Sequence, residues 1–478
     1  MSFKTTIPVL FFLALAAPIL AADAAEKKPE GWVFNGSVRA RAEAWDWFDT
    51  AAPGAGKEDD YTFFGSIVRL SGTKTGPRHD WTLEAAIPTL LGLPEDAVAP
   101  GAQGQLGQGG SYRAANGGQN LSVLLKQAHV TMKGREGRKM KVGRFEFVDG
   151  LECLTGDATL DWLKKERIGH RLIGTFGFTH VGRSFDGAQF SIDRPDTLFT
   201  VVGARPTQGV FDLDANEPID DVNLQYTSLT FRDSDKLQDG RIFAMRYSDE
   251  RALLKSDNRP LAARTIDRTP VEIYTFGGDW MRKAGDFDLL AWGVFQTGDW
   301  GSLEHEAWAF DAEVGHHFGG KHDPWLRAGY TASSGDTSAA DGRHETFFQV
   351  LPTPRIYARF PFYNMMNTQD LYAQLLFKPS KKTGARIEYH VLDLAESADL
   401  WYLGGGAFQR ETFGYAGRPS GGSTELANVL DAALDFKWDA DTNLTLYAAR
   451  AFGGNTVTAI YPAGDDASYF YAEVTRKF

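Results

Sequence analysis

The chain has 478 residues, a formal net charge of −12 and an aromatic content of 13%. This acidic balance argues against a nucleic-acid-binding protein, which needs a basic surface against the phosphates. The 51 glycines and the many aromatic residues favour strands and turns over helices, and the single cysteine excludes an intramolecular disulfide. No Pro-rich or Ser-rich linker divides the chain, so we expect one domain over residues 26–478.

The N-terminus has the pattern of a secretory signal. Lys4 precedes the apolar run "IPVLFFLALAAPIL", which the small-residue stretch "AADAA" follows. The run is shorter than the roughly 20 residues that a spanning helix needs. We therefore expect a signal peptide over residues 1–22, cut between positions 21 and 25, and an exported protein.

Segments in which apolar and polar residues alternate recur along the rest of the chain and predict about eighteen strands. They lie at 31–45, 61–73, 80–87, 121–133, 137–147, 184–193, 196–205, 221–231, 240–248, 270–282, 286–297, 304–318, 323–332, 367–378, 382–393, 424–437, 441–451 and 467–478. Short turns such as "GRE", "KAG" and "DAD" alternate with long loops near 88–120, 145–183, 333–366 and 394–423. This asymmetry is typical of an all-β transmembrane antiparallel barrel with short periplasmic turns and long extracellular loops.

A soluble β-sandwich or propeller is the alternative fold, because its strands also alternate. The length of the strands and the aromatic residues at their ends argue against it. In the last segment, "YFYAEVTRKF", Phe470, Val474 and Phe478 share one face, whereas Tyr471 and Glu473 share the other. With an even number of strands, we expect this segment to close the barrel against the first strand.

Several motifs resemble the bacterial alginate export family of outer-membrane porins. They are "KMKVGRFEFVDG" at 139–150, "RLIG" at 171–174, "GRSFDGAQFSID" at 182–193, "SSGDTSAADGRHETFFQVLPT" at 333–353 and "YHVLDLAESADLWYLGGG" at 389–406. The resemblance implies an eighteen-stranded barrel in the outer membrane of a Gram-negative bacterium. It also implies an electropositive pore that passes an anionic polysaccharide or other solutes, with external loops folding into the lumen.

The strand registers predict a lumen with both signs of charge, unlike a purely basic pore. The predicted inward cations are Arg39, Arg41, Arg69, Lys139, Lys141, Arg246, Arg327, Lys378, Arg386 and Lys437. The predicted inward acids are Glu43, Glu84, Asp279, Asp288, Glu313, Glu388, Asp431, Asp435 and Glu473. Cross-strand ion pairs lining a wet wall would explain most of them.

Solute selectivity needs a local excess of one sign at a constriction. Arg39, Arg41 and Arg69 form the best such cluster, because arginine is permanently charged and its fork fits carboxylates. By resemblance, Arg144 and Asp186 match motif positions that flank the loop 145–183, and Arg183 adjoins them. These three residues are candidates for a constriction formed by that loop.

The loop 145–183 contains a predicted short helix, "GDATLDWLKKE", with Asp157 as its N-cap. Leu160 and Leu163 share one face of this helix, and Lys164 follows late in the run, where cations suit the helix C-terminus. A helix in this position fits either a plug inside the pore or a cap over it.

No catalytic, metal or cofactor site is expected. His316 and His317 are neighbours on a strand and face opposite ways, and no HExxH motif accompanies them. The glycine-rich stretches, including "GQLGQGG" at 104–110, lack the setting of a phosphate loop and are typical of turns. Only His129 and His390 are inward histidines in the predicted registers.

The sequence thus predicts a monomeric outer-membrane channel, surrounded by lipid, for passive passage of anionic saccharides or similar small solutes. The alternative is a secretion component that exports an anionic exopolysaccharide and docks periplasmic partners. The turn "RDSDKLQD" at 232–239 is the only extended one available for such docking.

Overall fold

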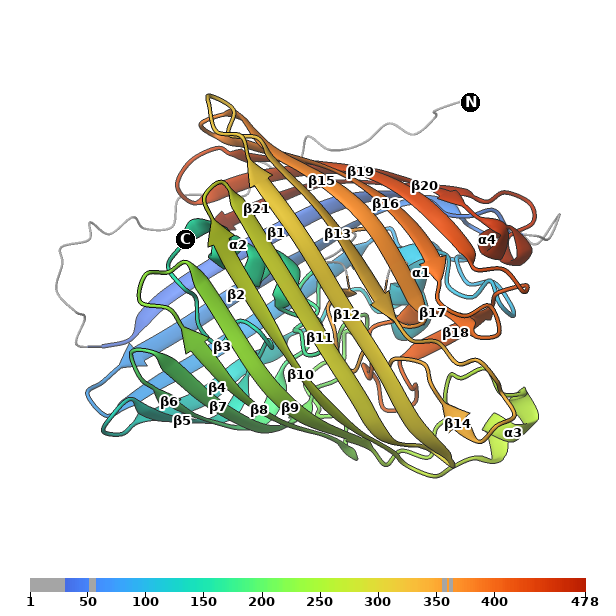
Figure 1. Ribbon diagram of the computed structural model, residues 1–478, viewed down its shortest axis with the longest axis horizontal. Coiled ribbons are helices and arrows are strands. Elements are labelled where there is room, and N and C mark those ends of the chain that lie inside the picture. Colours follow the sequence, from blue (N-terminus) through green and yellow to red (C-terminus); the bar gives the residue numbers. More distant parts are fainter. Residues whose placement is uncertain (1–30, 51–56, 355–358, 361–363) are drawn as a thin grey trace.

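Eighteen antiparallel strands close into a barrel in the computed structural model (Figure 1), which describes residues 31–50, 57–354, 359–360 and 364–478. The predicted signal peptide, residues 1–22, lies outside the described residues. Within the described ranges, no helix is long and apolar enough to cross a bilayer.

The barrel strands pair in chain order, and each predicted strand corresponds to one of them. They are β1 (Val33–Asp46), β2 (Asp60–Thr75), β3 (His79–Leu91), β4 (Leu124–Lys133), β5 (Arg138–Phe145), β6 (Phe185–Asp193), β7 (Thr197–Pro206), β8 (Val222–Arg232), β9 (Gln238–Asp249), β10 (Val271–Ala284), β11 (Phe287–Trp300), β12 (Leu303–His317), β13 (Trp325–Ser333), β15 (Thr368–Ser380), β16 (Thr383–Leu394), β19 (Glu425–Lys437), β20 (Thr442–Gly453) and β21 (Asp466–Lys477). The predicted fold class is confirmed.

Further elements lie in the long loops, and all of them except α2 and the turn that follows it gather at one end of the barrel (Figure 1). They are the two-residue strand β14 (Arg343–His344), the hairpin of β17 (Leu400–Gly404) and β18 (Tyr415–Pro419), and the helices α1 (Gly107–Asn116), α2 (Ala158–Leu163), α3 (Leu261–Ile266) and α4 (Asn455–Ile460). A π-helical turn, η1 (Lys164–Ile168), continues α2. The sequence predicts α2 but none of the other loop elements.

The two faces of each strand meet different surroundings. Phe34, Phe276 and Tyr389 point outward and are 77%, 50% and 46% exposed, whereas the inward Thr275 and His390 are fully buried. Successive side chains of a strand alternate between its faces, so the apolar row meets lipid and the polar row meets the lumen.

The barrel closes between β1 and β21, as the sequence predicts. The backbone N–H of Gly36 donates to the carbonyl oxygen of Phe478 at 2.7 Å, and the N–H of Phe478 donates back at 2.9 Å. In the same ladder Arg41 lies opposite Glu473. The last strand therefore has no free edge.

One glycine-rich stretch is helical where the sequence predicts a turn. Gly107 to Gly110 begin α1, which packs against the inner wall and a neighbouring loop. A Cβ on Gly109 would lie 2.4 Å from the Tyr61 ring, and one on Gly110 would lie 2.4 Å from the Ala97 carbonyl oxygen. The glycines permit this close approach of the helix, which outweighs their low helix propensity.

Candidate functional site

The segment 146–184, here called the plug, connects β5 to β6 and fills much of the barrel interior. Its helix α2 begins at Asp157, whose carboxylate accepts hydrogen bonds from the N–H groups of Thr159 and Leu160 at 3.0 and 3.1 Å. Leu160 and Leu163 are buried, as the sequence predicts. Three buried ion pairs join the plug to inward residues of β9 and β12: Lys164–Asp239 at 2.7 Å, Arg167–Glu313 at 2.7 Å, and Arg171–Asp311.

The plug pairs with the loop between β13 and β15 across the lumen. The N–H of Gly174 donates to the Leu351 carbonyl oxygen at 2.8 Å, and Thr353 Oγ1 accepts from the N–H of Phe176 at 2.9 Å. His170 Nδ1 lies 3.1 Å from the same Thr353 hydroxyl. We call this contact region the constriction, because neighbouring residues within it line two different cavities.

The two cavities share the constriction as a wall. Phe176 and Pro354 line a cavity of about 550 Å³ on the loop side, here called the outer cavity. Phe178 and Thr353 line a cavity of about 310 Å³ on the other side, here called the inner cavity.

The inner cavity contains the two arginines of β1 that the sequence selects. Arg39 donates to the carbonyl oxygens of Gly177 and Thr179 in the plug, both at 2.5 Å. Arg41 pairs with Glu473 at 2.6 Å, and its guanidinium carbon lies 4.0 Å from the Phe178 ring centroid. These arginines hold the plug and the seam together.

Charge in the inner cavity is compensated. Among the described residues its lining has three arginines and three carboxylates, which are Arg39, Arg41, Arg359, Glu166, Asp435 and Glu473. The predicted excess of positive charge at Arg39 and Arg41 is therefore not found there.

Several of the other predicted inward cations also have partners. Arg69 contacts Glu84 of the wall and lies 2.9 Å from Glu146 of the plug, and it does not line the inner cavity. Further contacts are Arg327 with Asp288 and with Glu313 at 2.6 Å, Arg386 with Glu388 at 3.4 Å, and Lys141 with the Phe145 ring centroid at 5.3 Å.

The expectation that Arg246 enters the lumen is wrong. Arg246 shares the outer face of its strand with Ile242, which is 57% exposed, and pairs with Glu272 at 2.8 Å. The arginine of β9 that enters the lumen is Arg241, whose Nη2 lies 2.7 Å from Asp279. The expected register of β9 was therefore shifted by one residue, which exchanges its two faces.

Arg144 and Asp186 also lie away from the constriction. Arg144 follows Met140 and Val142, which are 42% and 38% exposed, on the outer face of β5. Its guanidinium forms two hydrogen bonds to Asp186, at 2.7 and 2.6 Å. This bidentate pair joins β5 to β6 at the base of the plug.

Arg183 lies at the end of the plug and is fully buried. It donates to the carbonyl oxygens of Gly405 and Ala407 at 2.5 and 3.2 Å. No carboxylate among the described residues lies within 4.0 Å of it. Its guanidinium carbon lies 5.7 Å from the ring centroid of Phe176, which lines the outer cavity, so Arg183 places positive charge behind that ring.

The outer cavity has a one-sided charge that the sequence does not reveal. Arg264 and Arg418 are the only charged residues among its described lining, and six aromatic residues accompany them: Trp47, Phe176, Phe211, Phe408, Phe413 and Tyr415. Both arginines donate only to backbone oxygens, and Arg418 Nε has no partner among the described residues. Both lie in long loops, where alternation gives no register to predict their direction.

The closed barrel, its lipid-facing apolar belt and its plugged lumen define an outer-membrane porin of a Gram-negative bacterium. Its fold matches solved porins at low sequence identity. OccK2 (OpdF) of Pseudomonas aeruginosa has a TM-score of 0.56 and 9% identity, over 93% of this chain and 97% of that chain. A BenF-like porin from Pseudomonas fluorescens Pf-5 has a TM-score of 0.55 and 9% identity, over 94% and 99%. OccAB4 of Acinetobacter baumannii has a TM-score of 0.52 and 11% identity, over 93% and 97%.

The chain belongs to the alginate export family, whose model matches residues 119–468. The comparison with curated protein sequences found no match. The family and the porin neighbours are channels rather than enzymes.

Proposed function

We propose that this porin is a passive channel for anionic saccharides and related small carboxylates. The observation that carries the proposal is the outer cavity, which combines two arginines and six aromatic side chains with no acidic residue among its described lining. A guanidinium fork fits a carboxylate, and an aromatic face packs against the apolar face of a sugar or aromatic ring.

The arrangement of the two cavities suits conduction. Positive charge in a low-dielectric vestibule raises the local concentration of anions. The balanced charges of the inner cavity keep affinity low at the next step, and weak successive sites let a solute leave. A crystal structure of OpdK of Pseudomonas aeruginosa, whose fold is similar, contains vanillate. Aromatic carboxylates are therefore among the solutes to test.

The test is the reversal potential of the refolded protein in a planar bilayer under a salt gradient. Oligouronates, neutral oligosaccharides of equal length and vanillate are then titrated as blockers. We expect anion selectivity, with stronger block by oligouronates than by neutral sugars. The double variant R264Q/R418Q should reduce both effects.

R246Q is the matched control, because Arg246 lies on the outer face of the barrel and should leave selectivity unchanged. Cation selectivity, or equal block by neutral and acidic sugars, would refute the proposal.

The family match favours a second function, export of an anionic polysaccharide with periplasmic partners. Leu237 is 50% exposed in the turn between β8 and β9, where a partner would dock. Liposomes that contain only the barrel separate the two functions. Uptake of oligouronates without any partner supports the passive channel, whereas uptake that requires a periplasmic extract supports the secretion component.

A further inference from the structure

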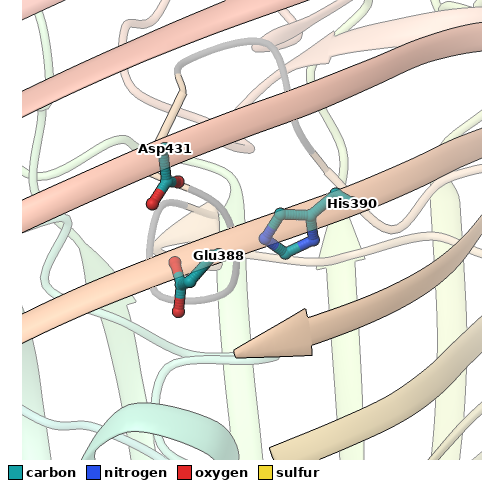
Figure 2. A group of neighbouring side chains, drawn as sticks. All are labelled: Glu388, His390 and Asp431. Atoms are coloured by element: carbon teal, nitrogen blue, oxygen red, sulfur yellow. The ribbon is translucent and has the colours of Figure 1, made fainter. Parts of the chain in front are cut away.

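Three side chains meet on the inner face of β16 and β19 in an arrangement that the channel function does not use. They are Glu388, His390 and Asp431, and one ligand atom of each lies within 4.8 Å of the others (Figure 2). All three residues are at most 2% exposed. Glu388 lies opposite Asp431 in the ladder of these strands, which fixes their separation.

Each of these side chains has one polar atom without a partner among the described residues. The three atoms are His390 Nε2, Glu388 Oε2 and Asp431 Oδ1. In Figure 2 the imidazole directs a ring nitrogen toward the two carboxylates. Buried polar atoms are normally satisfied, so three unsatisfied atoms at one point offer a place for a ligand.

The remaining polar atoms are held by neighbours on β15 and β20. Asp370 Oδ2 lies 2.9 Å from His390 Nδ1, and the Tyr447 hydroxyl donates to Asp431 Oδ2 at 3.0 Å. The Gln374 amide donates to Glu388 Oε1. In the neutral tautomer whose Nδ1–H donates a hydrogen bond to Asp370, the Nε2 atom has a free lone pair on the side of the carboxylates.

We propose that Glu388, His390 and Asp431 bind a divalent transition-metal ion such as Zn²⁺, Co²⁺ or Mn²⁺. One imidazole nitrogen and two carboxylate oxygens suit such ions, and a carboxylate behind the imidazole is the usual support of a metal-bound histidine.

Carboxylates surround the proposed ion position. They belong to Asp370, Glu388 and Asp431, and Arg386 lies 3.4 Å from Glu388. Arg359 and Arg167 also interact electrostatically with Glu388, so a metal ion competes with these arginines for the carboxylates. The ion would join β16 to β19 beside the inner cavity, since Arg386 also lies 3.8 Å from Glu166 in its lining.

Cobalt binding to the refolded full-length protein tests the proposal. After dialysis against EDTA, Co²⁺ is titrated while its visible absorption is followed, and equilibrium dialysis gives the stoichiometry. We expect one Co²⁺ per chain, displaced by Zn²⁺. H390Q should weaken binding at least about tenfold, and D370N, which changes a positioning residue, by about 10–100-fold. H129Q is the control, because His129 is inward on β4 and outside the cluster.

A second measurement uses the unmodified protein, so its result does not depend on whether the variants fold. The electron paramagnetic resonance spectrum of the Cu²⁺-loaded protein should show superhyperfine coupling to one imidazole nitrogen. Absence of stoichiometric Co²⁺ binding, equal binding by H390Q, or a Cu²⁺ spectrum without nitrogen coupling would overturn the proposal. The cluster would then be a network of side chains that share a proton.

Discussion

Arg41 on the first strand forms an ion pair with Glu473 on the last strand, and the Arg41 Nη2 to Glu473 Oε2 distance is 2.6 Å. The Arg41 side chain is 2% exposed and that of Glu473 is 16% exposed. This pair crosses the seam at which the barrel closes. The pair therefore stabilises the closure of the barrel, and both of its residues also line the inner cavity.

We expect E473Q to lower the free energy of unfolding, because it leaves Arg41 buried with less compensation. The loss should be about 1–3 kcal/mol, which is less than the about 3–5 kcal/mol of a fully buried pair because Glu43 still lies 3.3 Å from Arg41. Urea unfolding in lipid vesicles, followed by tryptophan fluorescence, measures the change.

D466N provides the matched control on the same strand. Asp466 pairs with Arg450 at 2.7 Å, but both side chains are about half exposed, at 47% and 49%. Exposed pairs contribute only about 0–1 kcal/mol. A loss for E473Q no larger than that for D466N would contradict a structural role for the seam pair.

Arg39 should restrain the plug, since both of its donor bonds reach plug carbonyl oxygens. We expect R39A to increase single-channel conductance and current noise, because the segment around Gly177 and Thr179 loses its anchor on β1. Single-channel recording measures both quantities. R246A removes an arginine from the outer face and should leave them unchanged. Unaltered conductance in R39A would show that the plug is held elsewhere.

The barrel could be predicted from the sequence because every strand shows the same alternation of apolar and polar residues. Lipid outside and water inside impose the same two-residue period, and chain connectivity fixes the order of the strands. Position along a strand is less certain, because a shift by one residue exchanges the faces. For this reason the predicted register of β9 places Arg246 on the inner face, where the structure has Arg241. The predicted register of β16 places Arg386 and His390 on the inner face, where the structure has them.

The outer cavity could not be predicted in the same way. Arg264 and Arg418 come from two loops that meet only in the folded barrel, and no period relates them. The ion pairs of Arg69, Arg144 and Arg327 could likewise not be predicted from the sequence. Sequence composition gives the number of charges, but only the fold shows which charges lack compensation.

Glu313 links the plug to the barrel wall. It lies 2.7 Å from Arg167 of the plug and 2.6 Å from Arg327 of the wall, and all three side chains are at most 2% exposed. We expect E313Q to destabilise the barrel by about 3–5 kcal/mol, because two buried arginines lose their shared carboxylate.

A double-mutant cycle with R167Q isolates the contact between Glu313 and the plug. The coupling energy should be within about 0.5–3 kcal/mol, as for residues in one ion-pair network. Urea unfolding of the two single variants and the double variant measures it. Additive losses would mean that Glu313 acts through its other partners, Arg327 and Arg171, and not through Arg167.

Asp336, in the loop after β13, should make that loop sensitive to pH. Its Oδ1 accepts from the N–H of Ser338 at 2.9 Å, and its own N–H donates to Asp399 Oδ2 at 3.0 Å. Burial, with a further contribution from Asp399, raises the pKa of Asp336 to about 7. The folded loop therefore binds a proton more tightly than the unfolded chain does.

The sign of the pH effect follows from this proton binding. Local stability is highest when Asp336 is protonated and falls as pH rises from about 4, the unfolded pKa, toward 7. Hydrogen exchange of residues 333–346, corrected for intrinsic rates, should show more protection at pH 5 than at pH 8. D336N should reduce the difference to the part that comes from Asp399, whose pKa burial also raises. D439N, which removes an exposed carboxylate in a short turn, should retain the full difference. Equal protection at both pH values in the unmodified protein would show that Asp336 remains ionised in the folded loop.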